Sequence, residues 1–98
     1  MIGVFVTFEG ADGPDRDRAA KVAHEARHMF EGMPGLRSKA FTYDDSAARA
    51  TNFYVWDSEE AARGFFTPQL TELVIGLYGV APTIAYVEIL ENVENAVA

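Results

Sequence analysis

The sequence predicts one small α+β domain whose strands and helices follow the order β-α-β-β-α-β. Three observations support this prediction: four short β-branched and aromatic runs, two segments with helical apolar spacing, and a polar hairpin loop between the two middle runs. Right-handed crossovers convert this order into a four-stranded antiparallel sheet with both helices on one face, the ferredoxin-like arrangement. No linker, repeat or low-complexity tract interrupts the chain, so residues 1–98 are expected to form a single domain.

The first strand and the first helix are separated by a turn. Residues 2–9 form a β-branched and aromatic run that ends in a turn rich in Gly, Asp and Pro. From about residue 15 to residue 32, apolar side chains recur at helical spacing, and Asp12 or Asp15 can cap the start. Gly32 and Pro34 end the pattern. The apolar stripe of this helix consists of Ala19, Val22, Ala23, Ala26, Met29, Phe30 and Met33.

A second helix and a last strand are expected in the C-terminal part of the chain. Ser58 is a suitable helix cap because acidic residues follow it in the first turn. Pro68 interrupts this helix, and a second helical piece continues to about Leu77. Residues 83–90 form the last strand, and residues 91–98 are expected to be a frayed tail or an arm across a partner.

The predicted sheet is apolar on both faces. Along the first strand the two faces carry Ile2, Val4, Val6 and Phe8 against Phe5 and Thr7. Along the last strand they carry Ile84, Tyr86 and Leu90 against Ala85, Val87 and Ile89, and in the middle Tyr54 and Trp56 against Phe53 and Val55. Two helices cover only one face, so the other face is expected to pack on the sheet of a second copy. We therefore predict a homodimer; the alternative is a monomer with an exposed apolar face.

Composition excludes several classes of function. Eight basic against fifteen acidic residues give a formal charge of −7, and the basic residues do not cluster, which disfavours nucleic acid and anionic membranes as partners. The absence of cysteine excludes thiolate nucleophiles and cysteine-ligated metals. The N-terminus does not resemble a signal peptide, and no apolar run reaches membrane-spanning length, so a cytoplasmic location is expected.

The first helix contains the string His24-Glu25-Ala26-Arg27-His28, which matches the H-E-x-x-H pattern of zinc peptidases. In those enzymes two histidines one helical turn apart bind zinc, and the glutamate activates water. Here His24 and His28 lie opposite the apolar stripe, and Arg27 would place a cation beside the metal. We therefore interpret the string as the solvated face of an amphipathic helix and predict no metal site.

The middle hairpin carries the candidate site. Residues 36–43 and 49–56 are strand-like, and the polar residues 44–48 join them. With a symmetrical loop, three pairs share one face: Lys39 with Tyr54, Phe41 with Asn52, and Arg37 with Trp56. The opposite face would carry Leu36, Ser38, Ala40, Thr51, Phe53 and Val55.

Lys39 is the residue of this face that is best suited to bind a ligand or to react with one. An amine enclosed by Phe41, Tyr54 and Trp56 either reaches water along its stem or meets an anionic or polar ligand. Desolvation would lower its pKa, and a ligand anion would restore its charge. The alternative is an edge-strand charge that opposes aggregation, and the sequence leaves both interpretations open.

Three segments resemble the YdhR-like family of mono-oxygenases. Residues 33–41 (MPGLRSKAF) are similar to its P-G-L-x-x-K-x-W segment. Residues 52–62 (NFYVWDSEEAA) are similar to its G-G-x-Y-x-F strand and the acidic, Ala-rich helix start that follows, and residues 79–82 (GVAP) to its closing segment. Two departures lie in the presumed pocket: Phe41 stands where the family has Trp, and Asn52 where it has Gly.

This resemblance implies a dimeric α+β barrel and a mono-oxygenase that acts without metal or flavin on an aromatic or polyketide-like compound. Lys39 and Asn52 would hold the substrate anion, Tyr54 would form a hydrogen bond to it, and Phe41 and Trp56 would stack on it. Lys39 and Tyr54 are thus the predicted catalytic residues, and Phe41, Asn52 and Trp56 the predicted substrate-binding residues. An isomerase or cyclase would use the same pocket, and a non-catalytic binding dimer remains an alternative.

Overall fold

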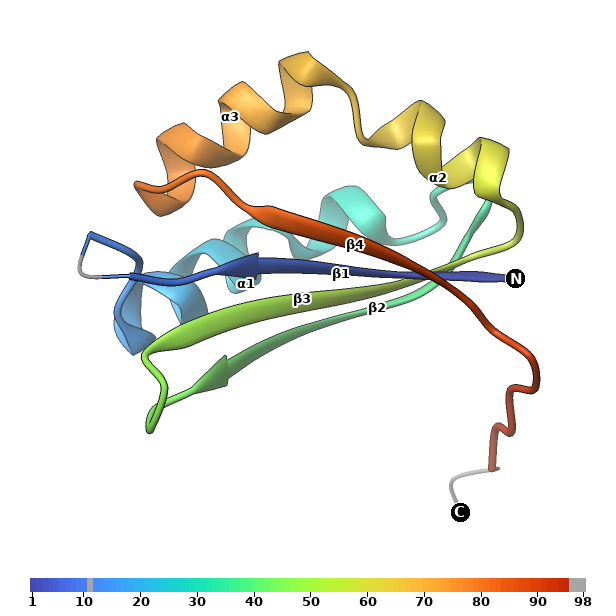
Figure 1. Ribbon diagram of the computed structural model, residues 1–98, viewed down its shortest axis with the longest axis horizontal. Helices are drawn as coiled ribbons and strands as arrows, with labels where there is room; N and C mark the ends of the chain where they lie inside the picture. Colours follow the sequence, from blue (N-terminus) through green and yellow to red (C-terminus); the bar gives the residue numbers. More distant parts are fainter. Residues whose placement is uncertain (11, 96–98) are drawn as a thin grey trace.

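The computed structural model describes residues 1–10 and 12–95 (Figure 1). It confirms the predicted order, with the second helix divided into two pieces. The strands are β1 (Ile2–Phe8), β2 (Leu36–Asp44), β3 (Arg49–Trp56) and β4 (Thr83–Glu88). The helices are α1 (Arg16–Phe30), α2 (Glu59–Phe65) and α3 (Pro68–Tyr78). Within the described ranges, no helix combines the length and the hydropathy that a membrane span requires.

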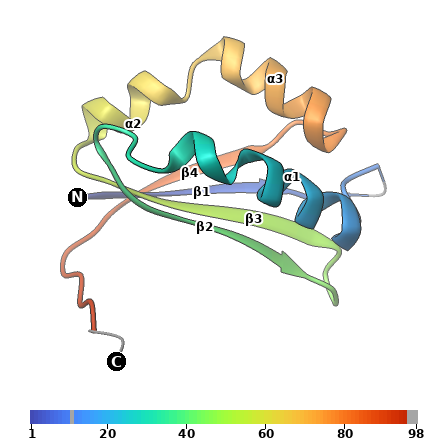
Figure 2. The ribbon, with the colours of Figure 1, turned by 180° about the vertical axis from the view of Figure 1, so that it is seen from behind.

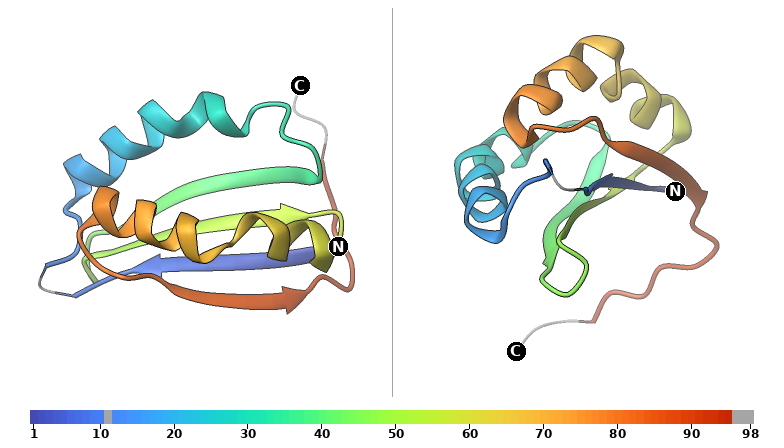
Figure 3. Two further views of the ribbon diagram at one scale, coloured as in Figure 1. Left: turned by 90° about the horizontal axis from the view of Figure 1, so that it is seen from above. Right: turned by 60° about the vertical axis from the view of Figure 1, so that its left-hand side comes forward.

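The four strands form one antiparallel sheet in the order β2-β3-β1-β4 (Figure 1). Seen from above, α1 and the α2–α3 pair lie along the strands on the same side of the sheet (Figure 3). The opposite face carries no helix (Figure 3). The structure is therefore a two-layer ferredoxin-like domain, with its core between the helices and the sheet.

Local capping explains where the helices begin and end. The side chains of Asp15, Ser58 and Thr67 each accept a hydrogen bond from a backbone N–H three residues later, and these bonds cap α1, α2 and α3. Gly79 ends α3 at a φ of 85°, a left-handed conformation that glycine adopts without a steric penalty. Arg18 links α1 to the end of α3, because its Nε donates a hydrogen bond of 2.8 Å to the Leu77 carbonyl.

The register of the middle hairpin confirms two of the three predicted pairs. Lys39 lies opposite Tyr54, and Phe41 lies opposite Asn52. The pairing of Arg37 with Trp56 is wrong, because a register shift between Leu36 and Ser38 makes Leu36 the partner of Trp56. Arg37 is therefore the additional residue of a bulge, which sends its side chain to an exposed ion pair with Asp57.

The same bulge corrects the placement of Leu36. It had been assigned to the face opposite Lys39, but it packs partly buried against the core that contains Trp56. A bulge shifts the alternation of side chains by one position, so Leu36 turns toward the helices. The alternation from Ser38 to Asp44 is unaffected, since the register is regular there.

The face of the sheet that carries no helix is apolar at its centre. The rings of Phe5 and Phe53 lie 4.6 Å apart there, and Phe5 and Val87 are 39% and 41% exposed. On the other side of β4, Leu90 does not continue the face of Ile84 and Tyr86 as predicted, because β4 ends at Glu88 and Leu90 is 83% exposed beyond it. Residues 91–95 of the expected tail lead away from the sheet (Figure 2), and residues 96–98 lie outside the described part of the chain.

Candidate functional site

A cavity of about 120 Å³ lies between the sheet and the helices. Its floor is formed by the helix-facing side chains Val6, Phe8, Lys39, Phe41, Asn52, Tyr54 and Ile84. Its roof is formed by residues of all three helices, which are mostly aliphatic or aromatic. The lining residues with polar side chains are Lys39, Asn52, Tyr54, Thr71 and Tyr78. A ligand in this cavity would thus meet an apolar wall with a small number of polar groups, the usual character of a small-molecule site.

The cavity opens to solvent between α1 and α3. Three of its lining residues on these helices are large, apolar and exposed: Met29, Leu73 and Leu77. We call these three residues the mouth. Met29 belongs to the predicted apolar stripe of the first helix, yet it is 55% exposed. An apolar mouth favours ligands with little charge on the part that passes through it.

Lys39 reaches the cavity from the edge strand β2. Its Nζ lies 3.5 Å from the ring centroid of Phe30, 4.1 Å from that of Phe41 and 4.4 Å from that of Tyr54. Burial among these rings lowers the pKa of the Lys39 amine to about 7, because the charged form loses hydration. The ring faces attract the ammonium and offset part of that loss. The amine is therefore poised between its charged and neutral forms near neutral pH.

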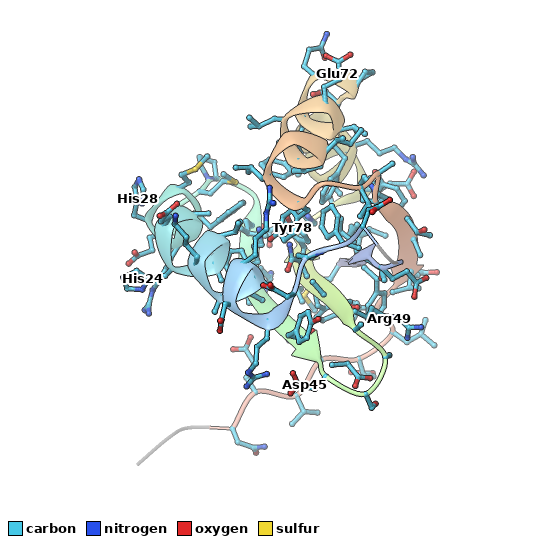
Figure 4. All side chains as sticks on the ribbon, turned by 90° about the vertical axis from the view of Figure 1, so that its left-hand side faces the viewer. His24, His28, Asp45, Arg49, Glu72 and Tyr78 are labelled. Atoms are coloured by element: carbon cyan, nitrogen blue, oxygen red, sulfur yellow. The ribbon has the colours of Figure 1, made fainter. Side chains whose placement is uncertain are left out.

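Asn52 and Tyr78 form a second polar group on the cavity wall. Asn52 is 4% exposed, and its Nδ2 donates a hydrogen bond of 3.2 Å to the Tyr78 hydroxyl. The ring of Tyr78 stacks on Phe8 with the centroids 3.9 Å apart, which fixes the hydroxyl between the helices and the sheet (Figure 4). Burial raises the pKa of Tyr78, and the hydrogen bond from Asn52 lowers it to a smaller extent. The neutral phenol can therefore donate its own proton to a ligand.

Tyr78 was not among the residues selected from the sequence. The predicted helix ends near Leu77, whereas α3 continues to Tyr78, so the sequence pattern as interpreted gives Tyr78 no role. The signal was nevertheless present: Leu70, Val74 and Tyr78 recur every four residues and all line the cavity. Extending the helical periodicity by one residue would have placed Tyr78 on the inward face.

Tyr54 lies at the centre of the aromatic cluster beneath the cavity. It is 5% exposed, and burial raises its pKa, with a smaller contribution from nearby Tyr78. Trp56 stacks on Tyr54 at 6.1 Å but is covered by Phe65 and is absent from the residues that line the cavity. The structure thus brings Lys39, Phe41, Asn52 and Tyr54 to one cavity and places Trp56 one layer behind them.

The indole of Trp56 has an unusual environment. The side chain is 2% exposed, and its N–H has no hydrogen-bond partner among the described residues. Aromatic rings of β3 and α2 surround it instead. A buried donor without an acceptor costs free energy, so the packing of the indole rather than its N–H holds it in place.

The histidines of the H-E-x-x-H string lie on the outside of α1. His24 and His28 are both exposed and project away from the sheet (Figure 4). This agrees with the expected solvated face. Within residues 1–10 and 12–95, no group of three or more potential metal ligands comes together.

No family model and no curated protein matches the sequence. Solved structures do match across nearly the whole chain. A protein of Nitrosomonas europaea with unknown function aligns at a TM-score of 0.73 and 14% identity, covering 97% of this chain and 94% of that one.

Two further matches have descriptions that name an activity. The monooxygenase from the gene ActVA-Orf6 of Streptomyces coelicolor, in complex with nanaomycin D, aligns at a TM-score of 0.68 and 22% identity, covering 97% and 92% of the two chains. A Deinococcus radiodurans protein, provisionally described as an antibiotic biosynthesis monooxygenase, aligns at 0.66 and 15%, covering 98% and 99%. The chain has the fold of these monooxygenases. At such identities the likeness establishes the fold alone, and both the activity and the YdhR-like relationship stay predictions.

Proposed function

We propose that this protein is a mono-oxygenase that oxidises a small aromatic or polyketide-like compound without metal or flavin. The observation that carries the proposal is the apolar cavity in which a poised amine, Lys39, and a paired amide and phenol, Asn52 and Tyr78, converge. The shared fold of the two monooxygenases supports it, and one of these binds nanaomycin D.

The proposed chemistry starts from an electron-rich phenol or enol. Lys39 removes or shares the acidic proton, and its ammonium then holds the substrate oxyanion. Asn52 orients Tyr78, whose neutral hydroxyl donates to a second substrate oxygen, and Tyr54 forms a further hydrogen bond. One O₂ then converts the phenol to a quinone and water, a reaction that balances without an external reductant. Phe41 supplies a ring face for stacking, and Trp56 acts through the packing of Tyr54.

An isomerase or cyclase is the second candidate. Both reactions require only that an enolate be formed and stabilised, and an amine whose pKa is about 7, such as that of Lys39, can serve as the base. The same cavity would hold such a substrate. A non-catalytic binding protein is the third candidate, since this fold supports many functions.

We further propose that the protein is a homodimer in which the two uncovered sheet faces pack together. The exposed apolar residues Phe5 and Val87 support this arrangement, since monomers rarely leave such a surface open at the centre of a sheet. Light scattering at micromolar concentration tests it. A monomeric mass would contradict the proposal.

Oxygen uptake distinguishes the three candidate functions. The wild type should consume O₂ with at least one member of a panel of dihydroxy-aromatic compounds, and Lys39→Met should consume it more slowly. Lys21→Met, which replaces an exposed lysine on α1, is the matched control and should behave as the wild type. Turnover without O₂ uptake would indicate an isomerase or cyclase. Binding without turnover would indicate a binding protein and contradict the mono-oxygenase proposal.

A further inference from the structure

The amine of Lys39 has an environment that anion binding alone does not require. Lys39 and Lys21 are the two lysines of the sequence, and Lys21 is exposed on α1. Among the described residues, Lys39 forms no ion pair with a carboxylate. Its Nζ contacts the faces of Phe30, Phe41 and Tyr54 instead. With no carboxylate paired to it among the described residues, the partly buried ammonium loses hydration, and this loss favours the free amine.

A desolvated lysine amine is a nucleophile at neutral pH. Its lone pair is free when the proton is lost, and apolar surroundings promote that loss. An ordinary hydrated lysine is almost wholly protonated at this pH and therefore reacts slowly. The position of Lys39 on a cavity wall adds the second requirement, since a ligand in the cavity lies beside the amine.

We propose that Lys39 condenses with the carbonyl group of an apolar aldehyde or ketone held in the cavity and forms an imine. The amine nitrogen forms a bond to the carbonyl carbon, and the carbonyl oxygen leaves as water with both amine protons. The step is a dehydration in which nothing is oxidised or reduced. It requires no co-reactant and does not depend on the mono-oxygenase proposal.

The cavity favours an aromatic carbonyl compound. Its volume of about 120 Å³ approaches that of an engineered apolar cavity of about 150 Å³ that binds benzene, so one ring can occupy it and a substituent can extend toward the mouth. A protonated imine carries its positive charge at the position of the present amine. The three ring faces that contact Nζ would then stabilise this cation.

A second hollow gives water a route to and from the amine. Lys39 also borders an open depression at the edge of the sheet, together with Arg27, Glu31 and Arg37. Phe30 and Phe41 line both this depression and the cavity, so the two spaces adjoin at Lys39. Water released by the condensation can leave there while the mouth remains filled by the ligand.

Reductive trapping tests the proposal on the intact protein. The folded wild type is incubated near pH 7 with benzaldehyde and sodium cyanoborohydride, and the benzylated sites are located and timed by peptide mass spectrometry. Lys39 should be modified about tenfold faster than Lys21 or more, because a larger fraction of its amine is neutral. The α-amino group of Met1 serves as an internal positive control. Equal rates at the two lysines would overturn the proposal.

Two controls test whether the reactivity of Lys39 depends on the folded structure and on the apolar cavity. In urea the two lysines should be modified at equal rates, since the preference arises from the folded environment; a preference that survives unfolding contradicts the proposal. Pyridoxal 5′-phosphate, a charged aldehyde, should modify Lys21 and leave Lys39 largely free, because its phosphate is excluded from an apolar cavity. Modification of Lys39 at the same rate by both aldehydes would show that reagents reach it from the open depression, which would also overturn the proposal.

Lys39→Arg distinguishes a failure of this inference from a failure of the proposed function. Arginine retains a cation for a substrate oxyanion but cannot form a stable imine. Trapping at position 39 should disappear in this variant, whereas O₂ uptake should be partly retained if the amine serves as an anion holder. Wild-type protein that consumes O₂ but shows no trapping would refute the imine and leave the mono-oxygenase proposal intact.

Discussion

Replacing Lys39 with Met should stabilise the folded protein at neutral pH, and the gain should decrease as the pH rises. Methionine has a similar length and no charge, so it fills the same space without a buried ammonium. Burial lowers the pKa of Lys39 to about 7, whereas the unfolded chain restores a lysine pKa of about 10.4. Between these values the unfolded state binds one more proton than the folded state. The stability of the wild type must therefore increase with pH in this window.

The expected gain in stability follows from how far the pKa of Lys39 is lowered in the folded protein. Each pKa unit corresponds to about 1.4 kcal/mol, so the displacement from 10.5 to about 7 amounts to about 4 to 5 kcal/mol for a fully dehydrated amine. The three ring faces around Nζ favour the ammonium by about 1 to 2 kcal/mol, and the open depression provides some hydration. We therefore expect Lys39→Met to be more stable than the wild type by about 2 to 3 kcal/mol near pH 6, where the amine is charged in both states.

Urea unfolding of both proteins from about pH 6 to about pH 9.5 measures this effect. Relative to Lys39→Met, the wild type should gain up to about 1.4 kcal/mol per pH unit within this range, and about 2 to 3 kcal/mol in total. Tyr54 and Tyr78 have raised pKa values and titrate above this range in both proteins, so they cancel in the comparison. Lys21→Met is the matched control and should follow the wild type. If the curves of Lys39→Met and the wild type stay parallel, Lys39 is hydrated and the poised amine does not exist.

Three further predictions concern other parts of the molecule. Trp56→Ala should destabilise the fold by about 3 to 5 kcal/mol in urea unfolding. Trp56→Phe should cost clearly less, because phenylalanine keeps an aromatic ring and lacks the unpaired N–H. A larger loss for Trp56→Phe than for Trp56→Ala would show that the indole N–H has a partner. Tyr78→Phe should lower kcat/KM by about tenfold on any substrate found, because Asn52 loses its acceptor and the substrate loses a donor; an unchanged kcat/KM would exclude Tyr78 from the reaction. Phe5→Glu should convert the proposed dimer to a monomer in light scattering, since it places a charge on the apolar sheet face. The control Glu72→Gln, on the outer side of α3 (Figure 4), should keep the dimer mass. A Phe5→Glu variant that also keeps the dimer mass would place the interface elsewhere.

The hairpin illustrates what could be inferred before the fold was known. The alternation along β2 and β3, with a symmetrical loop between them, was sufficient to place Lys39 opposite Tyr54 and Phe41 opposite Asn52. The same reasoning was wrong at Arg37, because a bulge depends on how the strand end meets Gly35 and Asp57 rather than on the local pattern. A shift of one residue then reversed the side on which Leu36 lies.

The sequence by itself determined the order of strands and helices, the antiparallel sheet with one uncovered face, and the convergence of Lys39, Asn52 and Tyr54 on one side. These features depend on spacing between neighbours in the chain, and the period of a strand or helix can be read directly. Only the tertiary structure decided that Phe30 closes over Lys39 and that Tyr78 reaches Asn52. Each of these contacts joins a helix to a strand, and their meeting depends on how the helices pack across the sheet, which no local pattern encodes.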